Sequence, residues 1–344
     1  MINAAFDFLE FLHSNFAFLF SLVLYTVLAI ALSKSIKKNY KVYYTIFGLL
    51  SFAFIIPVIF RLCGATFPIS FGSIPLFGPC ISELSSGANF LHPVLVIIMY
   101  MGAFSPKNQY IGRLMSIRKE LSIIVGFPVL AHAMKRIFGS FVEGWKFFFD
   151  HEEFMQSPRV SSVLGSGISS FVYVLGIVMF TLFLVLWITS FDSVHRKLGT
   201  KRWKSIQKWS YGLYAMLFIH ALGLQVGSLI SSAAREKQMS QQPRTEQVQM
   251  AHGAQTPQQG GESRGPQQAQ AGQGGAPQQG QAPQAAQQHG HGRPKSFSFV
   301  DNITISRTTK SWIHIFTLFL VYGSYLYFRL RKAKNDKAKR MPRV

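Results

Sequence analysis

The sequence predicts an all-α membrane protein, a polytopic membrane helix bundle of seven transmembrane helices. Three observations predict it. Of the 344 residues, 49% are hydrophobic. Seven apolar runs approach the length of about 20 residues that a helix needs to cross a bilayer. The cationic residues, which give a formal net charge of +21, gather in the connections between these runs instead of coating a soluble domain.

The seven apolar runs are the expected transmembrane helices. They cover approximately 14–33, 43–61, 90–105, 120–139, 166–190, 207–231 and 311–329. The third run is short. The first resembles the apolar part of a secretory signal, but Asp7 stands where such a signal carries cations, and no small-residue cleavage site follows. We therefore expect the first run to be retained as a helix.

The cationic residues predict the orientation, because short loops rich in Lys and Arg stay in the cytoplasm. Four groups follow the first, third, fifth and seventh runs: Lys34, Lys37, Lys38 and Lys41; Lys107, Arg113, Arg118 and Lys119; Arg196, Lys197, Lys201, Arg202, Lys204 and Lys208; and Arg329, Arg331, Lys332, Lys334, Lys337, Lys339, Arg340 and Arg343. All four fall on one side. The N-terminus is therefore expected outside and the C-terminus in the cytoplasm, with exoplasmic segments at 62–89, 140–165 and 232–310. Nucleic-acid binding is not expected, because it requires a basic face on a folded soluble module.

The chain divides into five parts on this basis. They are an extra N-terminal transmembrane helix with its cytoplasmic loop (1–42), a central helix bundle (43–231), an exoplasmic loop (232–310), a last transmembrane helix (311–330) and a basic cytoplasmic tail (331–344). Within the loop, residues 234–295 are rich in Gln, Gly, Pro and Ala and almost lack large apolar side chains. Such a composition cannot bury enough surface to fold, so we expect this segment to be disordered.

Two pairs of residues in the exoplasmic segments leave alternatives open. The two cysteines, Cys63 and Cys80, either form a disulfide in an oxidising periplasm or remain thiols, since the sequence does not supply their separation. His289 and His291, in "HGHGR", either belong to a solvated linker or capture a metal weakly. The absence of a nearby further ligand favours the linker.

Two histidines inside predicted spans are the candidate site, because an ionisable group within the membrane needs a partner. His132 lies 13 residues beyond Lys119, and His220 lies 12 residues beyond Lys208, where the two cations mark the inner edges of their helices. At 1.5 Å per residue, both imidazoles lie roughly 18–20 Å from that edge. Imidazoles at matched depth on neighbouring helices can hold one haem iron from opposite faces. The alternative is two unrelated histidines, each hydrogen-bonded to a neighbour.

Five further histidines are expected to be structural. His13, His92 and His314 lie near predicted outer ends, where interfacial water can solvate them, and His151 and His195 lie in loops.

Two stretches carry a family resemblance. "RKELSIIVGFPVLAH" (118–132), followed by "WITSFDSVHRKLGTKRWKSIQKWSYGLYAMLFIH" (187–220), resembles the ferric-reductase-like transmembrane family. The likeness is strongest to its MsrQ/YedZ branch, the haem b membrane subunits that feed a periplasmic methionine sulfoxide reductase. The shared features are basic residues and Leu before an apolar helix ending in His, Thr-Ser at a helix end, and a basic loop with Gly shortly before Trp. The resemblance covers about residues 43–330.

The resemblance implies that His132 and His220 are the ligands of one haem b on the outer side. The family's other histidine of the later helix, 13 residues earlier, corresponds to Gln207, and the same step on the earlier helix gives Lys119. Neither is a good iron ligand beside imidazole, so no inner haem is expected.

Two cations just beyond His132 are candidates for the rest of a haem site. Lys135 and Arg136 lie one turn further out, where they either pair with haem propionates or extend to the membrane interface.

A haem iron with two histidine ligands has no open position, so the expected function is electron transfer, as a subunit of an oxidoreductase system in the bacterial inner membrane. The acceptor would be exoplasmic, such as a periplasmic reductase. No Gly-rich dinucleotide motif follows a strand pattern, so the donor would be a separate flavin reductase, or a quinol or FMN bound within the bundle. The cationic inner rim with Trp203 and Trp209 suits either a flavin phosphate or anionic lipid headgroups of the bilayer. The alternatives are a transporter or channel subunit that uses the intramembrane histidines, and a membrane scaffold without cofactor.

Overall fold

The computed structural model describes residues 2–69, 87–105, 107–150, 162–241 and 306–338, with isolated positions at 71, 74, 78, 84, 152 and 154. These residues form helices and their connections, and no strand occurs among them. The predicted all-α class is confirmed. Within the described residues, six helices are long and apolar enough to cross a membrane, which makes this a multi-pass membrane protein.

The six long helices correspond to six of the seven predicted runs. They are α1 (Ile2–Ala31), α3 (Tyr40–Leu62), α7 (Arg118–Phe149), α9 (Val163–Ile188), α11 (Ser210–Gln241) and α13 (Arg307–Ala338). Several exceed the runs that predicted them, because helix-forming polar residues extend them beyond the apolar part. Residues 234–241 illustrate this extension, since they were expected to be disordered and instead form the end of α11. The remainder of the Gln-rich segment to residue 295, with His289 and His291, lies outside the described residues, as do Cys80 and His151.

The predicted run at 90–105 is a short, buried helix. It forms a π-helical turn, η2 (Gly87–Leu91), followed by the ten-residue α5 (His92–Met101), which has a proline in its first turn and is followed by Gly102. Eight of the ten α5 residues are buried, and Val96 has no exposed surface. A helix enclosed by other helices does not have to match the bilayer thickness, because its neighbours exclude lipid from it. Among the described residues there are therefore six long apolar helices and a shorter, buried one.

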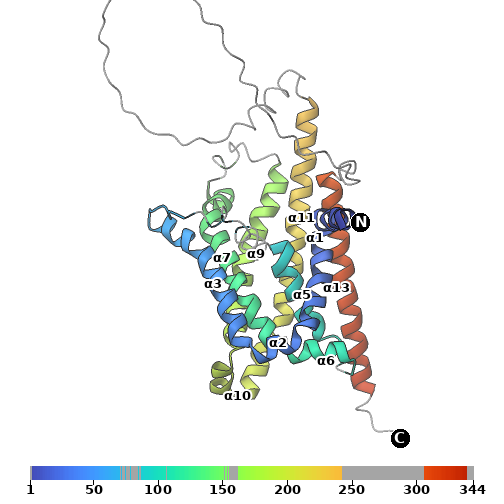
Figure 1. Cartoon of the computed structure of the whole chain (residues 1–344). Coiled ribbons are helices and arrows are strands. Elements are labelled where there is room, and N and C mark those ends of the chain that lie inside the picture. Colours follow the sequence, from blue (N-terminus) through green and yellow to red (C-terminus); the bar gives the residue numbers. More distant parts are fainter. Residues whose placement is uncertain are drawn as a thin grey trace, which may run out of the picture.

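Three short helices lie together at one end of the bundle. These are α2 (Ser33–Lys38), α6 (Gln109–Ser116) and α10 (Asp192–Gln207), and Figure 1 shows them at the same end as the C-terminal part of α13. The N-terminus of α1 lies toward the other end (Figure 1). The described members of the four groups of cations lie on these short helices, at the adjoining ends of α3 and α7, in the connections next to them or at the end of α13, so we call this the basic end of the bundle.

Helix packing puts α9 between α7 and α11, while α11 also packs on α13 and α1 packs on α5. The contact of α9 with α11 depends on small residues. A Cβ atom on Gly227 would lie 2.6 Å from the Oγ of Ser169, and one on Gly223 would lie 2.3 Å from a methyl carbon of Val172. Small residues allow membrane helices to approach closely and to gain dispersion contacts. This close approach positions His220 of α11 against the backbone of α9.

Candidate functional site

His220, on α11, packs against the backbone of α9. Its Nδ1 lies 3.0 Å from the carbonyl oxygen of Val172, and because a carbonyl only accepts, Nδ1 carries the proton. A Cβ atom on Gly176 would lie 3.0 Å from Cε1 of the same ring, so the glycine provides the space that the imidazole occupies. This tautomer leaves a lone pair on Nε2, and no other hydrogen bond to the ring is present among the described residues. Metal-ligating histidines are commonly oriented in this way.

His132 is half-buried on α7, one turn after the buried Pro128. One turn further out, the hydroxyl of Tyr173 on α9 donates to the carbonyl of Arg136. Since α7 and α9 run in opposite directions, this bond places His132 beside the part of α9 just inward of Tyr173. The contacts of His220 are with the same part of α9, so the two histidines lie within about one helical turn of the same depth.

Lys135 and Arg136, the two cations predicted to lie beside the histidines, are directed to different neighbouring helices. The Nζ of Lys135 lies 4.8 Å above the ring of Phe54, so this side chain is directed to α3 and away from α11. Arg136 is exposed beyond His132, on the α9 side. A cation–π contact of this kind contributes on the order of 0.5–1 kcal/mol and is sufficient to orient a lysine.

His92 departs from its expected environment. It was expected to be solvated near an outer helix end, but its side chain is only 6% exposed. Its Nε2 lies 2.9 Å from the hydroxyl of Tyr322, and its ring packs 4.6 Å from that of Phe18, which also contacts His314. The reason is that α5 begins inside the bundle, where its first residue meets α1 and α13. Across the described residues, no group of three or more His, Cys, Asp or Glu side chains could hold a metal ion.

A large cavity lies at the basic end, and we call it the inner cavity. Its volume is about 590 Å³, and residues of α5, α6, α7, α9, α10 and α11 line it. The walls combine apolar side chains such as Leu95 and Leu213 with the aromatic rings of Trp187, Trp203 and Tyr214. Pockets for small organic ligands are of this size and mainly apolar. His132 and His220 do not line the inner cavity.

Hydrogen bonds to backbone carbonyls fix the two tryptophans of this wall. The Nε1 of Trp187 donates to the carbonyl of Ile123 at 3.1 Å, and the Nε1 of Trp203 donates to Thr189 at 2.9 Å. Of the two tryptophans that the sequence placed at the inner rim, only Trp203 lines the cavity, while Trp209 is exposed.

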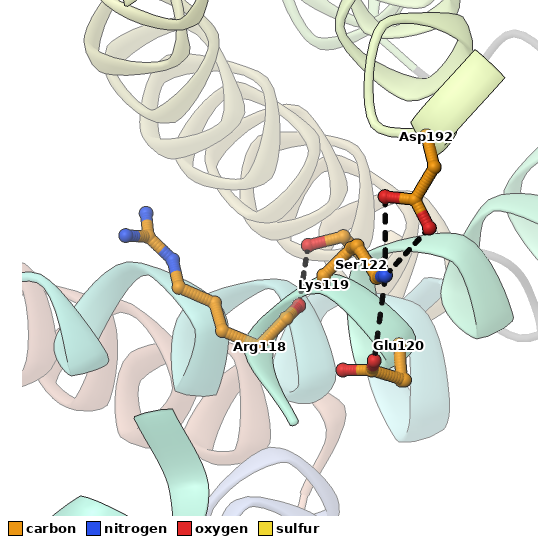
Figure 2. A network of polar contacts seen from close by, with 5 residues as sticks. All are labelled: Arg118, Lys119, Glu120, Ser122 and Asp192. Carbon is orange, nitrogen blue, oxygen red and sulfur yellow. Dashed lines mark hydrogen bonds and ion pairs between the residues drawn. The ribbon is translucent and has the colours of Figure 1, made fainter. Parts of the chain in front are cut away.

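The positions that correspond to an inner histidine pair carry other interactions. The Nε2 of Gln207 donates to the Oγ1 of Thr189 at 3.0 Å. Figure 2 shows Lys119 between two carboxylates, with Nζ 3.0 and 3.2 Å from the oxygens of Asp192 and 3.7 Å from Glu120. Both side chains therefore stabilise the junction of α7, α9 and α10.

Glu120 is a buried carboxylate at this junction. Its residue is 8% exposed, and its Oε2 has no hydrogen-bond partner among the described residues. A buried oxygen without a partner costs free energy, so this carboxylate is a destabilising group that the junction retains.

Sequence reasoning did not identify several residues of the basic end. Arg329 and Lys332 served there only as indicators of topology, and Arg118 also as part of the family resemblance, yet all three line cavities. Trp187 was noticed only within the "WITS" stretch. An available signal was the aromatic residue at the inner end of an apolar helix, where aromatic side chains often pack against ligands or headgroups.

The comparisons with known proteins identify no family. No model of a known protein family matches the sequence, and no solved structure matches it. An uncharacterized protein of Treponema pallidum (strain Nichols) is 30% identical over 209 residues, which make up 59% of this chain and 49% of the relative. The chain thus spans about half the length of this relative.

Proposed function

We propose that this protein carries electrons across a bacterial inner membrane through one haem b held by His132 and His220. The observation that carries the proposal is the packing of His220 against α9. Its proton lies on Nδ1 and faces a carbonyl, Nε2 retains its lone pair, and Gly176 makes room for the ring. The donor chemistry therefore fits a haem, and the similar depth of His132 supplies a second imidazole.

The orientation of the chain in the membrane is part of this proposal. By the positive-inside rule, the basic end would lie in the cytoplasm, with the N-terminus and the 232–310 connection outside. When bound between two imidazoles, a haem iron supplies reversible one-electron transfer without an open coordination position. The protein would therefore transfer electrons and leave bond-making chemistry to partners.

The residues of the chain would perform three tasks. Val172 orients His220, and the helix contact through Tyr173 sets the depth of His132. The apolar side chains around them exclude water. The inner cavity would receive a flavin or quinol donor, or face a flavin reductase, and a periplasmic reductase is the expected type of acceptor.

The test is a pyridine haemochrome assay on protein purified from haem-replete cells. We expect about one haem per chain, as bis-histidine ligation of one iron requires. His132→Ala and His220→Ala should each abolish the reducible α band, while His195→Ala, at a histidine on α10, should retain it. His220→Leu keeps a bulky side chain without an iron-ligating atom should the alanine variant fail to fold. A colourless wild-type protein with normal helicity and a monodisperse elution profile would refute the proposal.

Glu120 favours a second candidate, the transporter or channel subunit. A buried carboxyl at the inner end of a span is a common element of proton-coupled transport. In proteoliposomes, this function predicts proton uptake that Glu120→Gln abolishes and that requires no haem. Unchanged uptake in Glu120→Gln would remove this candidate.

A further inference from the structure

We propose that the basic end of the bundle binds an organic phosphate, that is, a phosphate group attached to an apolar or aromatic body. A second cavity, of about 220 Å³, adjoins the inner cavity. The two share five lining residues: Met115, Arg118, Ser210, Tyr211 and Tyr214. They therefore form one continuous site. This inference rests on the proposed function only in that the inner cavity would there receive the donor, and it specifies the chemistry of the ligand; neither His132 nor His220 lines either cavity.

The charges that line the joined cavities are unbalanced. The cations are Arg118, Lys119, Lys204, Lys208, Arg329 and Lys332. One carboxylate, that of Asp192, lines the same space, and Lys119 binds it at 3.0 Å. Within the described part of the chain, no ion pair engages the other five cations. Like charges around a concave surface of low dielectric raise the potential there, and a bound anion relieves their repulsion.

Two of these cations are held in place by groups that do not neutralise them. The guanidinium of Arg329 donates to the carbonyl of Gly102 at 3.2 Å and to the hydroxyl of Tyr211 at 2.6 Å. The Nζ of Lys332 donates to the carbonyls of Gly102 and Phe104 at 3.0 and 2.9 Å. These bonds attach the end of α13 to the turn after α5 and fix both positive charges. Fixed cations lose less conformational freedom when an anion binds.

Arg118 joins the two cavities. It lines both, and Figure 2 shows its guanidinium directed away from the pair of Lys119 and Asp192. A guanidinium presents a planar set of donors that matches the oxygens of a phosphate. Arg118 is therefore the expected centre of the phosphate subsite.

The larger cavity suits the apolar body of the ligand. Its deeper walls include Leu95, Phe183 and Leu213. The N–H groups of Trp187 and Trp203 are already bonded to carbonyls, so these rings offer apolar faces. An inorganic anion alone would leave this surface without a partner, whereas a flat ring or an acyl chain would cover it. The chemistry is that of an amphiphilic phosphate, which a soluble nucleotide-like molecule or a phospholipid headgroup can supply.

The first arm of the test uses flavin mononucleotide as a fluorescent probe, with the full-length protein in phosphatidylcholine nanodiscs. Riboflavin, which lacks the phosphate, is the matched probe. We expect flavin mononucleotide to bind at least about tenfold more tightly than riboflavin. Arg118→Gln should remove this difference, and Arg118→Lys should retain part of it. Lys197→Gln, an exposed cation of α10 that does not line the cavities, should leave it unchanged.

The second arm tests the lipid source by native mass spectrometry of protein purified with phosphatidylglycerol. Retention of the lipid by the wild-type protein, lost in Arg118→Gln and kept in Lys197→Gln, supports the site with a lipid phosphate as its occupant. If phosphate dependence and Arg118 dependence are missing in both arms, the proposal is overturned. Neither readout uses haem, so His220→Ala should give the wild-type result, and a failure here is separate from a failure of the haem assay.

Discussion

Replacing Gly126 with alanine tests how closely α7 and α9 pack beside the inner cavity. The indole of Trp187, from α9, lies directly on the backbone of α7 at this glycine. A Cβ atom at position 126 would lie 1.8 Å from Nε1 of that indole and 2.2 Å from Cδ1. Ordinary contact begins near 3.4 Å, so the ring has to move by about 1.6 Å (3.4 − 1.8).

The expected loss follows from three contributions. Moving the indole breaks the bond from Nε1 to the carbonyl of Ile123, which costs about 1–3 kcal/mol when the donor remains buried. Overpacking costs a further ~1–3 kcal/mol. Replacing Gly with Ala within a helix stabilises the helix by about 1 kcal/mol, which offsets part of this loss. The free energy of unfolding should therefore fall by roughly 1–5 kcal/mol. The displaced ring should also narrow the inner cavity and weaken binding of the phosphate probe.

The measurement is chemical unfolding in detergent micelles, followed by far-ultraviolet circular dichroism. Gly323→Ala is the matched control, because a Cβ atom there meets no atom within 4 Å, and it should be neutral or slightly stabilising. Trp187→Ala removes the ring that the new Cβ atom would meet. In a Trp187→Ala background, Gly126→Ala should therefore cause no further loss of unfolding free energy, so the losses of the two single variants should not add. If Gly126→Ala were as well tolerated as Gly323→Ala, or if the two losses were additive, the proposed contact would be wrong.

Two further predictions concern buried and exposed polar groups. Tyr322→Phe leaves the Nε2 of His92 without its partner in the core and should lower the free energy of unfolding by about 1–3 kcal/mol, whereas Tyr327→Phe, at an exposed tyrosine, should have no effect in the same unfolding assay. Asp192→Asn breaks the ion pair with Lys119, which is largely exposed, so stability should change by less than about 1 kcal/mol. The same variant frees a cation at the inner cavity, so the phosphate probe should bind more tightly at low salt, and unchanged or weaker binding would contradict this charge argument.

The helix class and the long helices could be predicted because each depends on local composition. An apolar run such as that of α9 has to be helical in a membrane, since only a helix satisfies its own backbone there. The length of α5 could not be predicted in this way. Its apolar run is compatible with a short span or with a buried helix, and enclosure by α1, α7 and α13 decides between them. Only the tertiary arrangement contains this information.

The candidate site was predictable in part for a similar reason. The depths of His132 and His220 follow from counting residues along straight helices, a local property. The direction of a side chain depends on which helix lies beside it, and Lys135 illustrates this, since it contacts Phe54 of α3. The sequence indicated a cationic inner rim with Trp203, but it did not indicate the cavity itself. The walls of the cavity come from six helices, and its size depends on how Trp187 packs against Gly126.

On both α7 and α11, the histidine lies at a similar distance along the helix axis from the inner cavity. His220 lies six residues beyond the cavity residue Tyr214, and His132 lies seven residues beyond the cavity residue Val125. At 1.5 Å per residue, these steps correspond to about 9 and 10 Å. Leu217, on the intervening turn of α11, is 7% exposed and packs in a cluster of apolar and tyrosine side chains. Under the proposed function, electrons from a donor in the inner cavity would cross this packed layer to reach the level of the histidines.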